Sequence, residues 1–120
     1  MKTSPEDTRE ERTDMKYTTA IEQKAAEYGF GKYGHTRWDF LKEHRPETYN
    51  DLVNSGELLN HLIEVENEAR ERKERFTEQR KKAAGVNLQM KKDNLLLYIQ
   101  KIQTIDAEVD HQIMEEIIYV

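Results

Sequence analysis

The residues most able to do chemistry in this sequence are cations gathered in one segment. Between residues 70 and 92, nine lysines and arginines stand against three glutamates, while residues 46–69 and 93–120 have net charges of −6 and −5. Clustered cations attract phosphate groups and carboxylates. The candidates for binding nucleic acid or an acidic partner here are Arg75, Arg80, Lys81, Lys82, Lys91 and Lys92. The alternative is a solvated helix face, on which these cations pair with glutamates three or four residues away.

A second group of cations is interleaved with aromatic residues. Its cations are Arg37, Lys42 and Arg45, and the aromatic residues among them are Tyr33, Trp38 and Phe40. Short helices in this region would allow a helix-turn-helix, with the helix from Thr36 to His44 as the reader of DNA and Arg37 as its first contact. The alternative is that Tyr33 and Trp38 belong to the hydrophobic core.

The remaining polar residues predict that the protein is not an enzyme. The chain has no cysteine, its four histidines lack the spacing of a metal-binding motif, and no serine lies in a nucleophile elbow. Residues 29, 31 and 34 have G-x-G-x-x-G spacing, but no β-rich run precedes them. We therefore expect a loop between helices there, with Phe30 and Tyr33 entering the core, and no catalytic residue, metal or cofactor.

The elements that must position these residues are predicted to be helical throughout. Apolar residues recur at spacings of three and four on both sides of Gly85, and a composition of 36% charged and 36% hydrophobic residues suits helices that bury one stripe. Gly85 and Val86 are expected to end one long helix, and Asn87 to cap the next. The expected helices cover residues 14–28, 36–44, 46–55, 57–84 and 87–119.

The predicted fold class is all-α, with short N-terminal helices packed on a long antiparallel, coiled-coil-like helical hairpin. Residues 1–14 are predicted to be a disordered tail and residues 15–120 a single helical domain. Within this domain, residues 15–56 form the short helices and residues 57–120 form the hairpin, hinged at Gly85.

The stretch from Leu95 to Ile99 is apolar all round, which is more than one helical partner needs. The N-terminal helices, a second copy in a homodimer, or another protein must cover part of this surface. No apolar run approaches the roughly 20 residues that span a bilayer. We therefore expect a cytoplasmic protein with no membrane partner.

A string of residues at fixed spacing runs through the first half of the chain. It consists of Gly31-Lys32-Tyr33-Gly34, Arg37, Leu41-Lys42-Glu43-His44-Arg45-Pro46, Tyr49, Leu52, Ser55-Gly56, Leu58, His61 and Leu62. Together with Gly85-Val86 and the ending Glu116 to Tyr119, this pattern resembles the TnpV family of transposon-encoded proteins over about residues 31–119. The chain departs from that family at Tyr98, where tryptophan is usual.

The resemblance implies a non-enzymatic accessory protein of a mobile genetic element that binds DNA or a recombinase–DNA complex. The alternative is a protein-binding inhibitor or adaptor carried by such an element, for example an anti-CRISPR or anti-defence protein. Its acidic segments, 46–69 and 93–120, would then mimic nucleic acid toward a basic host nuclease. DNA binding that weakens steeply with salt favours the first function, and capture of a nuclease without DNA binding favours the second.

Overall fold

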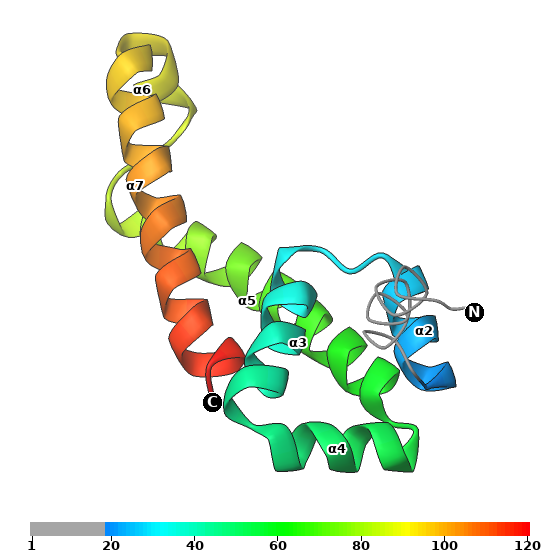
Figure 1. Cartoon of the computed structure of the whole chain (residues 1–120). Helices are drawn as coiled ribbons and strands as arrows, with labels where there is room; N and C mark the ends of the chain where they lie inside the picture. Colours follow the sequence, from blue (N-terminus) through cyan, green and yellow to red (C-terminus); the bar gives the residue numbers. More distant parts are fainter. Residues whose placement is uncertain (1–18) are drawn as a thin grey trace, which may run out of the picture. The chain divides into compact units, whose positions relative to one another are not determined.

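The computed structural model describes residues 19–120, and in this range the chain is helical and contains no β-strand (Figure 1). The predicted all-α class is confirmed. The chain forms two compact units, of which the first ends at Glu64 and the second runs from Val65 to Val120. The predicted tail at residues 1–14 lies outside the described residues. The packing of short helices against a long hairpin stays a prediction.

The first helix described, α2 (Ala20–Tyr28), has both ends defined by local chemistry. The hydroxyl of Thr19 accepts a hydrogen bond from the Glu22 amide at 3.1 Å, and the Thr19 amide donates to the Glu22 carboxylate at 3.2 Å. This capping box satisfies two backbone donors at the start of the helix. Gly29 ends the helix with φ of 79°, a left-handed conformation that suits glycine. The predicted end at residue 28 is confirmed.

Helix α3 (Lys32–His44) begins four residues before the predicted start at Thr36. Its N-cap, Gly31, has no side chain, so the sequence carries no polar capping signal at this point. The expected loop over the glycine cluster is therefore wrong from Lys32 onward. The buried residues Gly34, Arg37, Trp38 and Leu41 recur at helical spacing and give the helix its inner face.

Pro46 and Gly56 delimit α4 (Pro46–Ser55), as the sequence predicts. Pro46 lies in the first turn, where its missing N–H has no intrahelical partner to lose. Gly56 has φ of 78°, and the amide that follows it, on Glu57, donates to the Leu52 oxygen at 2.9 Å. This bond is characteristic of a glycine-ended helix.

Three hydrogen-bonded side chains join α2, α3 and α4 inside the first unit. The indole N–H of Trp38 donates to the Tyr49 hydroxyl at 3.2 Å, and this hydroxyl donates to Oε2 of Glu22. All three side chains are buried. Buried polar groups are stable only when they are paired, so the three residues depend on one another. The core around them contains Ala25, Phe30, Leu41, Leu58 and Leu62.

Helix α5 (Leu58–Ala83) begins in the first unit and continues into the second. Its C-terminal end follows the prediction: Gly85 has φ of 69°, the Val86 amide donates to the Lys81 oxygen at 2.9 Å, and the Val86 side chain is buried. The buried valine supplies the hydrophobic contact that accompanies such caps.

The second predicted long helix is divided into three parts: α6 (Leu88–Asp93), α7 (Leu95–Ile113) and a π-helix, η1 (Met114–Ile118). Asn87 caps α6 as predicted. Asn94 interrupts the chain, because its side-chain oxygen accepts a hydrogen bond from the Leu97 amide at 3.1 Å and its backbone leaves the helical region, with φ of −152° and ψ of 85°. The prediction of one helix over residues 87–119 is therefore wrong.

Within the second unit, ion pairs join α5 to α7 and η1. They connect Arg72 to Glu116 at 3.3 Å, Lys73 to Asp110 at 2.8 Å and Arg80 to Glu108 at 3.1 Å. The apolar face of α7 is formed by Ile105, Val109 and Ile113, all buried. Helix α6 lies beside the N-terminal part of α7 (Figure 1).

We predict that Tyr49→Phe lowers the free energy of unfolding by about 1–3 kcal/mol, because it leaves the buried Glu22 carboxylate and the Trp38 N–H without their common partner. Tyr28→Phe, at an exposed tyrosine, is the matched control and should change it by less than about 0.5 kcal/mol. Chemical denaturation followed by circular dichroism measures both. Equal stability of the two variants would contradict this role of Tyr49.

Candidate protein- and nucleic-acid-binding surfaces

Several candidate cations of α5 are paired with carboxylates of the same helix. Arg75 pairs with Glu71, and Lys81 pairs with Glu78 at 3.6 Å. These glutamates lie four and three residues away on the same helix. This pairing is the one expected if the segment is a solvated helix face rather than a binding site. Exposed pairs of this kind contribute little to stability, but they reduce the positive charge that a ligand meets.

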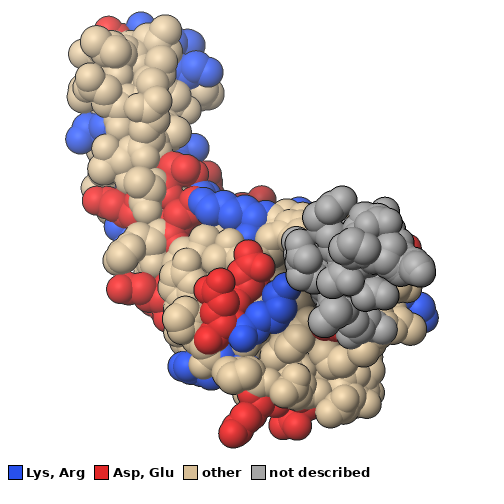
Figure 2. Space-filling view, in the orientation of Figure 1, with Lys and Arg blue, Asp and Glu red and all other residues tan. Residues whose placement is uncertain are grey.

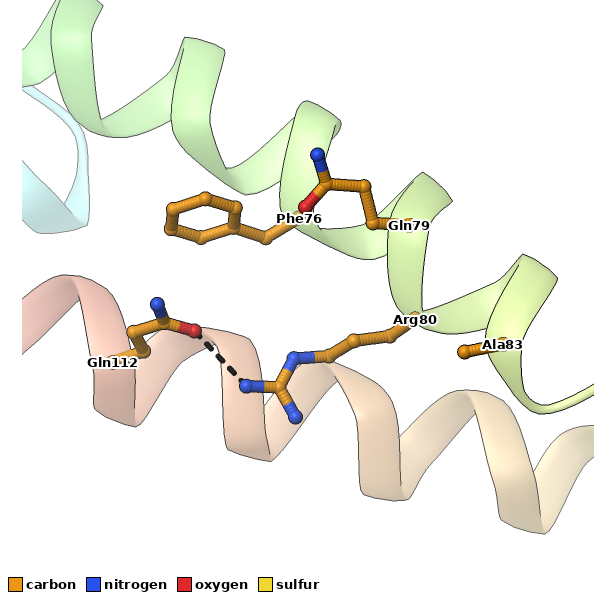
Figure 3. Close-up of a pocket in the computed structure, with 5 residues that line it drawn as sticks. All are labelled: Phe76, Gln79, Arg80, Ala83 and Gln112. Carbon is orange, nitrogen blue, oxygen red and sulfur yellow. Dashed lines mark hydrogen bonds between the residues drawn. The ribbon is translucent and has the colours of Figure 1, made fainter.

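Arg80 is paired across the second unit rather than within its own helix. Its guanidinium donates to Glu108 at 3.1 Å and to the Gln112 side-chain oxygen at 2.9 Å. Figure 3 shows the Arg80 side chain extending toward Gln112 in a pocket that Phe76 and two other α5 residues also line. Arg80 therefore contributes to the contact between α5 and α7.

Lys82, Lys91 and Lys92 are exposed and form no ion pair with any residue from 19 to 120. The Lys91 ammonium lies over the Tyr98 ring, 5.7 Å from its centroid. Lys91 and Arg80 contact different parts of α7. Tyr98, which Lys91 contacts, is ten residues before Glu108, the partner of Arg80, and the two positions are about 15 Å apart along the helix. The candidate cations of this segment are thus distributed along the second unit, and three of them remain open to a ligand.

Arg37, the predicted first contact with DNA, is buried in the first unit, with 8% of its surface exposed. Its Nε donates to Nε2 of His61 at 3.2 Å. Burial lowers the pKa of Arg37, and the charge of Arg45 lowers it further. Burial also lowers the pKa of His61; the charge of Arg37 adds to this effect, and Glu64 opposes it. The structure therefore uses Arg37 to connect α3 with the first turns of α5.

Lys42 and Arg45 lie against aromatic side chains of α3. The Lys42 ammonium is 5.4 Å from the centroid of the Trp38 ring, and the Arg45 guanidinium is 5.1 Å from that of Phe40. Such cation–π contacts orient a cationic side chain without neutralising it. Trp38 itself belongs to the core, which is the second of the two roles predicted for it, whereas Tyr33 is only half-buried.

Most of the large apolar side chains that are exposed among residues 19–120 lie in α6 and the first part of α7. We call residues 88–101 the tip. Its large apolar side chains are exposed: Leu88 by 71%, Leu95 by 52%, Leu96 by 67%, Leu97 by 37% and Ile99 by 41%. The space-filling view shows a largely uncharged surface at this end of the second unit, bordered by lysine and arginine atoms (Figure 2).

Sequence reasoning identified Leu95 to Ile99 but missed Leu88. Leu88 falls inside the single helix predicted over residues 87–119, which takes no account of the break at Asn94. With the break, α6 has six residues and none of them is buried. A short helix of this kind cannot hide an apolar side chain on an inner stripe.

Residues 19–120 contain no group of three or more histidine, aspartate or glutamate side chains that could hold a metal ion. No helix in this range is both long enough and apolar enough to cross a membrane.

These features define an all-α protein whose most distinctive surface is an exposed apolar tip bordered by cations. The chain belongs to the family described as transposon-encoded protein TnpV, whose family model matches residues 10–118. The resemblance proposed from the sequence is confirmed, and membership connects the chain with an accessory role in a mobile element. No curated protein and no solved structure matches it.

We predict that the free energy of unfolding falls as the pH is lowered from 7.5 to 5.5. Because the pKa of His61 is lower in the folded chain than its usual value of about 6.5, the unfolded state takes up more protons in this window. Stability is therefore present above about pH 6.5 and is lost below it, by at most about 1.4 kcal/mol per pH unit for one proton.

His61→Gln should remove part of this pH dependence, because glutamine can still accept the Arg37 hydrogen bond but does not titrate. His44→Gln, at an exposed position of α3, is the matched control and should leave the dependence unchanged. Denaturant titrations at a series of pH values measure it. An unchanged slope in the His61 variant would contradict this account of the Arg37–His61 pair.

Proposed function

We propose that this protein is a non-enzymatic accessory protein of a mobile element that binds a protein of the element's recombination complex through its tip. The observation that carries the proposal is the exposure of Leu88, Leu95, Leu96 and Ile99 on two short segments of one unit. Exposed apolar patches of this kind are typical of protein interaction sites. Membership in a transposon-encoded family supports the choice of partner.

The arrangement of the apolar side chains suits a helical partner. Leu95 and Leu96 lie four and three residues before Ile99, so the three side chains occupy adjacent positions on one face of α7. A partner helix could lay its own apolar stripe along this face. The backbone phosphates of DNA would gain little from contact with leucine and isoleucine, which favours a protein as the main partner.

We predict that the double variant Leu96→Ser/Ile99→Ser binds the element's recombinase at least about tenfold more weakly than the unmodified protein, since each side chain would be lost from an apolar interface. Val120→Ser, also at an exposed apolar residue of the second unit, is the matched control. Titration calorimetry with the recombinase and its DNA measures the affinities. Equal affinities of both variants would reject the tip as the binding site.

Direct contact with DNA is a second candidate, supported by the three lysines that lack ion pairs with described residues: Lys82, Lys91 and Lys92. Their charge is available for phosphates, unlike that of Arg75, Lys81 or Arg80. An accessory protein that touches both a recombinase and its DNA would combine the two surfaces.

For this candidate we predict binding of duplex DNA with a slope of log affinity against log salt of about −2.7, as expected for three phosphate contacts. Reversing the three lysines to glutamate should abolish binding, whereas Lys24→Glu, at an exposed position of α2, should not. Affinity that does not depend on salt, or that survives the triple reversal, would exclude this contact.

The inhibitor alternative, predicted from the acidic segments 46–69 and 93–120, could also use the tip, and it then differs from the first function in the partner. An anti-defence protein would bind a host nuclease, and its effect would be loss of cleavage by that nuclease. Inhibition of a purified host nuclease that is lost in Leu96→Ser/Ile99→Ser, without binding to the recombinase, would favour this function over the first.

A further inference from the structure

We infer that the tip recognises an acidic amphipathic helix, one that carries carboxylates beside an apolar stripe. This inference rests on the proposed function, which makes the tip a protein-binding surface, and adds the chemistry of the partner. It follows from two observations. Lysines lie beside the exposed apolar side chains, and these lysines form no ion pair with carboxylates of residues 19–120.

The cations of the second unit fall into two classes. Most cations of α5 are held by carboxylates: Arg72 pairs with Glu68 at 2.8 Å, and Lys73 pairs with Asp110 at 2.8 Å. Lys82, at the end of α5, forms no ion pair with any residue from 19 to 120. The tip has three lysines against one aspartate. Its aspartate, Asp93, accepts a hydrogen bond from Gln89 at 2.9 Å and forms no ion pair with any residue from 19 to 120.

Two of the tip lysines border the exposed apolar side chains. Lys92 is four residues after Leu88 in α6, and Lys91 is held over the Tyr98 ring of α7. The third, Lys101, lines a pocket together with Leu97, on the side of α7 turned away from Leu95 and Ile99. Neither Lys91 nor Lys92 forms an ion pair with any residue of the described chain. A partner that covered the leucines would bring its own flanking side chains against these two ammonium groups.

Electrostatic complementarity therefore selects among apolar partners. A helix with glutamates or aspartates beside its apolar stripe would pair with the lysines, while a basic helix would be repelled. A second copy of the tip is disfavoured for the same reason, because a symmetric contact would place unpaired lysines against one another.

The test uses two fluorescent helical peptides with the same leucine stripe, one with glutamates and the other with lysines on its flanks. Fluorescence anisotropy with the full chain measures their affinities over a range of salt concentrations. We expect the acidic peptide to bind at least tenfold more tightly than the basic one, and the difference to shrink as salt is added.

Three variants locate the contact. Leu96→Ser/Ile99→Ser should weaken binding of the acidic peptide about tenfold or more. Lys91→Glu/Lys92→Glu should remove the preference for this peptide, and Lys24→Glu should change neither. Equal binding of the two peptides, binding of neither, or a preference that survives the lysine reversal would overturn the inference. Concentration-dependent dimerisation that the tip variant abolishes would do so too, because the tip would then be covered by a second copy.

If the peptides fail but the recombinase still loses affinity for the Leu96→Ser/Ile99→Ser variant, the tip is a protein-binding site of another specificity, and only the further inference is wrong. If the recombinase binds that variant unchanged, the proposed function is wrong. The two results are obtained with the same purified proteins and are therefore directly comparable.

Discussion

The first unit depends on a buried carboxylate. Glu22 lies among apolar side chains and accepts a hydrogen bond from Tyr49, which in turn accepts one from Trp38. A buried charge without partners would cost several kcal/mol, so α2, α3 and α4 must supply these groups together. The same carboxylate accepts hydrogen bonds from Thr19 at the start of α2. One side chain thus takes part in both the start of a helix and the packing of three helices.

This arrangement gives a physical meaning to the residues that resemble the TnpV family. Gly56 and Gly85 end helices in left-handed conformations, and Leu41, Leu58 and Leu62 are fully buried. Arg37 and His61 bond to each other. The most distinctive residues of the sequence therefore build the scaffold. The exposed apolar side chains and unpaired lysines, which are better suited to a partner, lie in the second unit.

The sequence predicted the helix ends that carry a local chemical signal. Gly29, Gly56 and Gly85 each follow a helix, and Pro46 starts one, because their backbone preferences are intrinsic. It did not predict the start of α3, since Gly31 has no capping side chain. It also missed the break at Asn94, because asparagine is tolerated inside a helix and here the cap that its side chain forms decides the outcome.

The C-terminal π-helix shows another limit of periodicity. Ile105, Val109, Ile113 and Ile117 are spaced by four, and all are buried. Four residues turn an ideal α-helix by more than one turn, so this stripe drifts around the helix. A turn closed by a bond between residues five apart, as between the Tyr119 amide and the Met114 oxygen at 2.8 Å, holds more residues per turn. Spacing alone does not indicate where such a turn occurs.

The sequence shows that cations are concentrated between residues 70 and 92, but ion pairs in the folded chain decide which of these cations can bind a ligand. Lys73 and Arg80 of α5 form ion pairs with Asp110 and Glu108 of α7, which are distant from them in the sequence. Such pairs depend on the direction and register of two helices, which composition does not reveal. Lys91 and Lys92, in α6, form no ion pair with any residue from 19 to 120.

The central claim is that the partner binds the tip. Hydrogen–deuterium exchange of the protein alone and with the recombinase–DNA complex tests it most directly, because it reports the contact region without any substitution. The account predicts slower exchange over residues 88–101 and no change in the segment that contains Lys42 and Arg45. Protection of that segment, with none at residues 88–101, would contradict it.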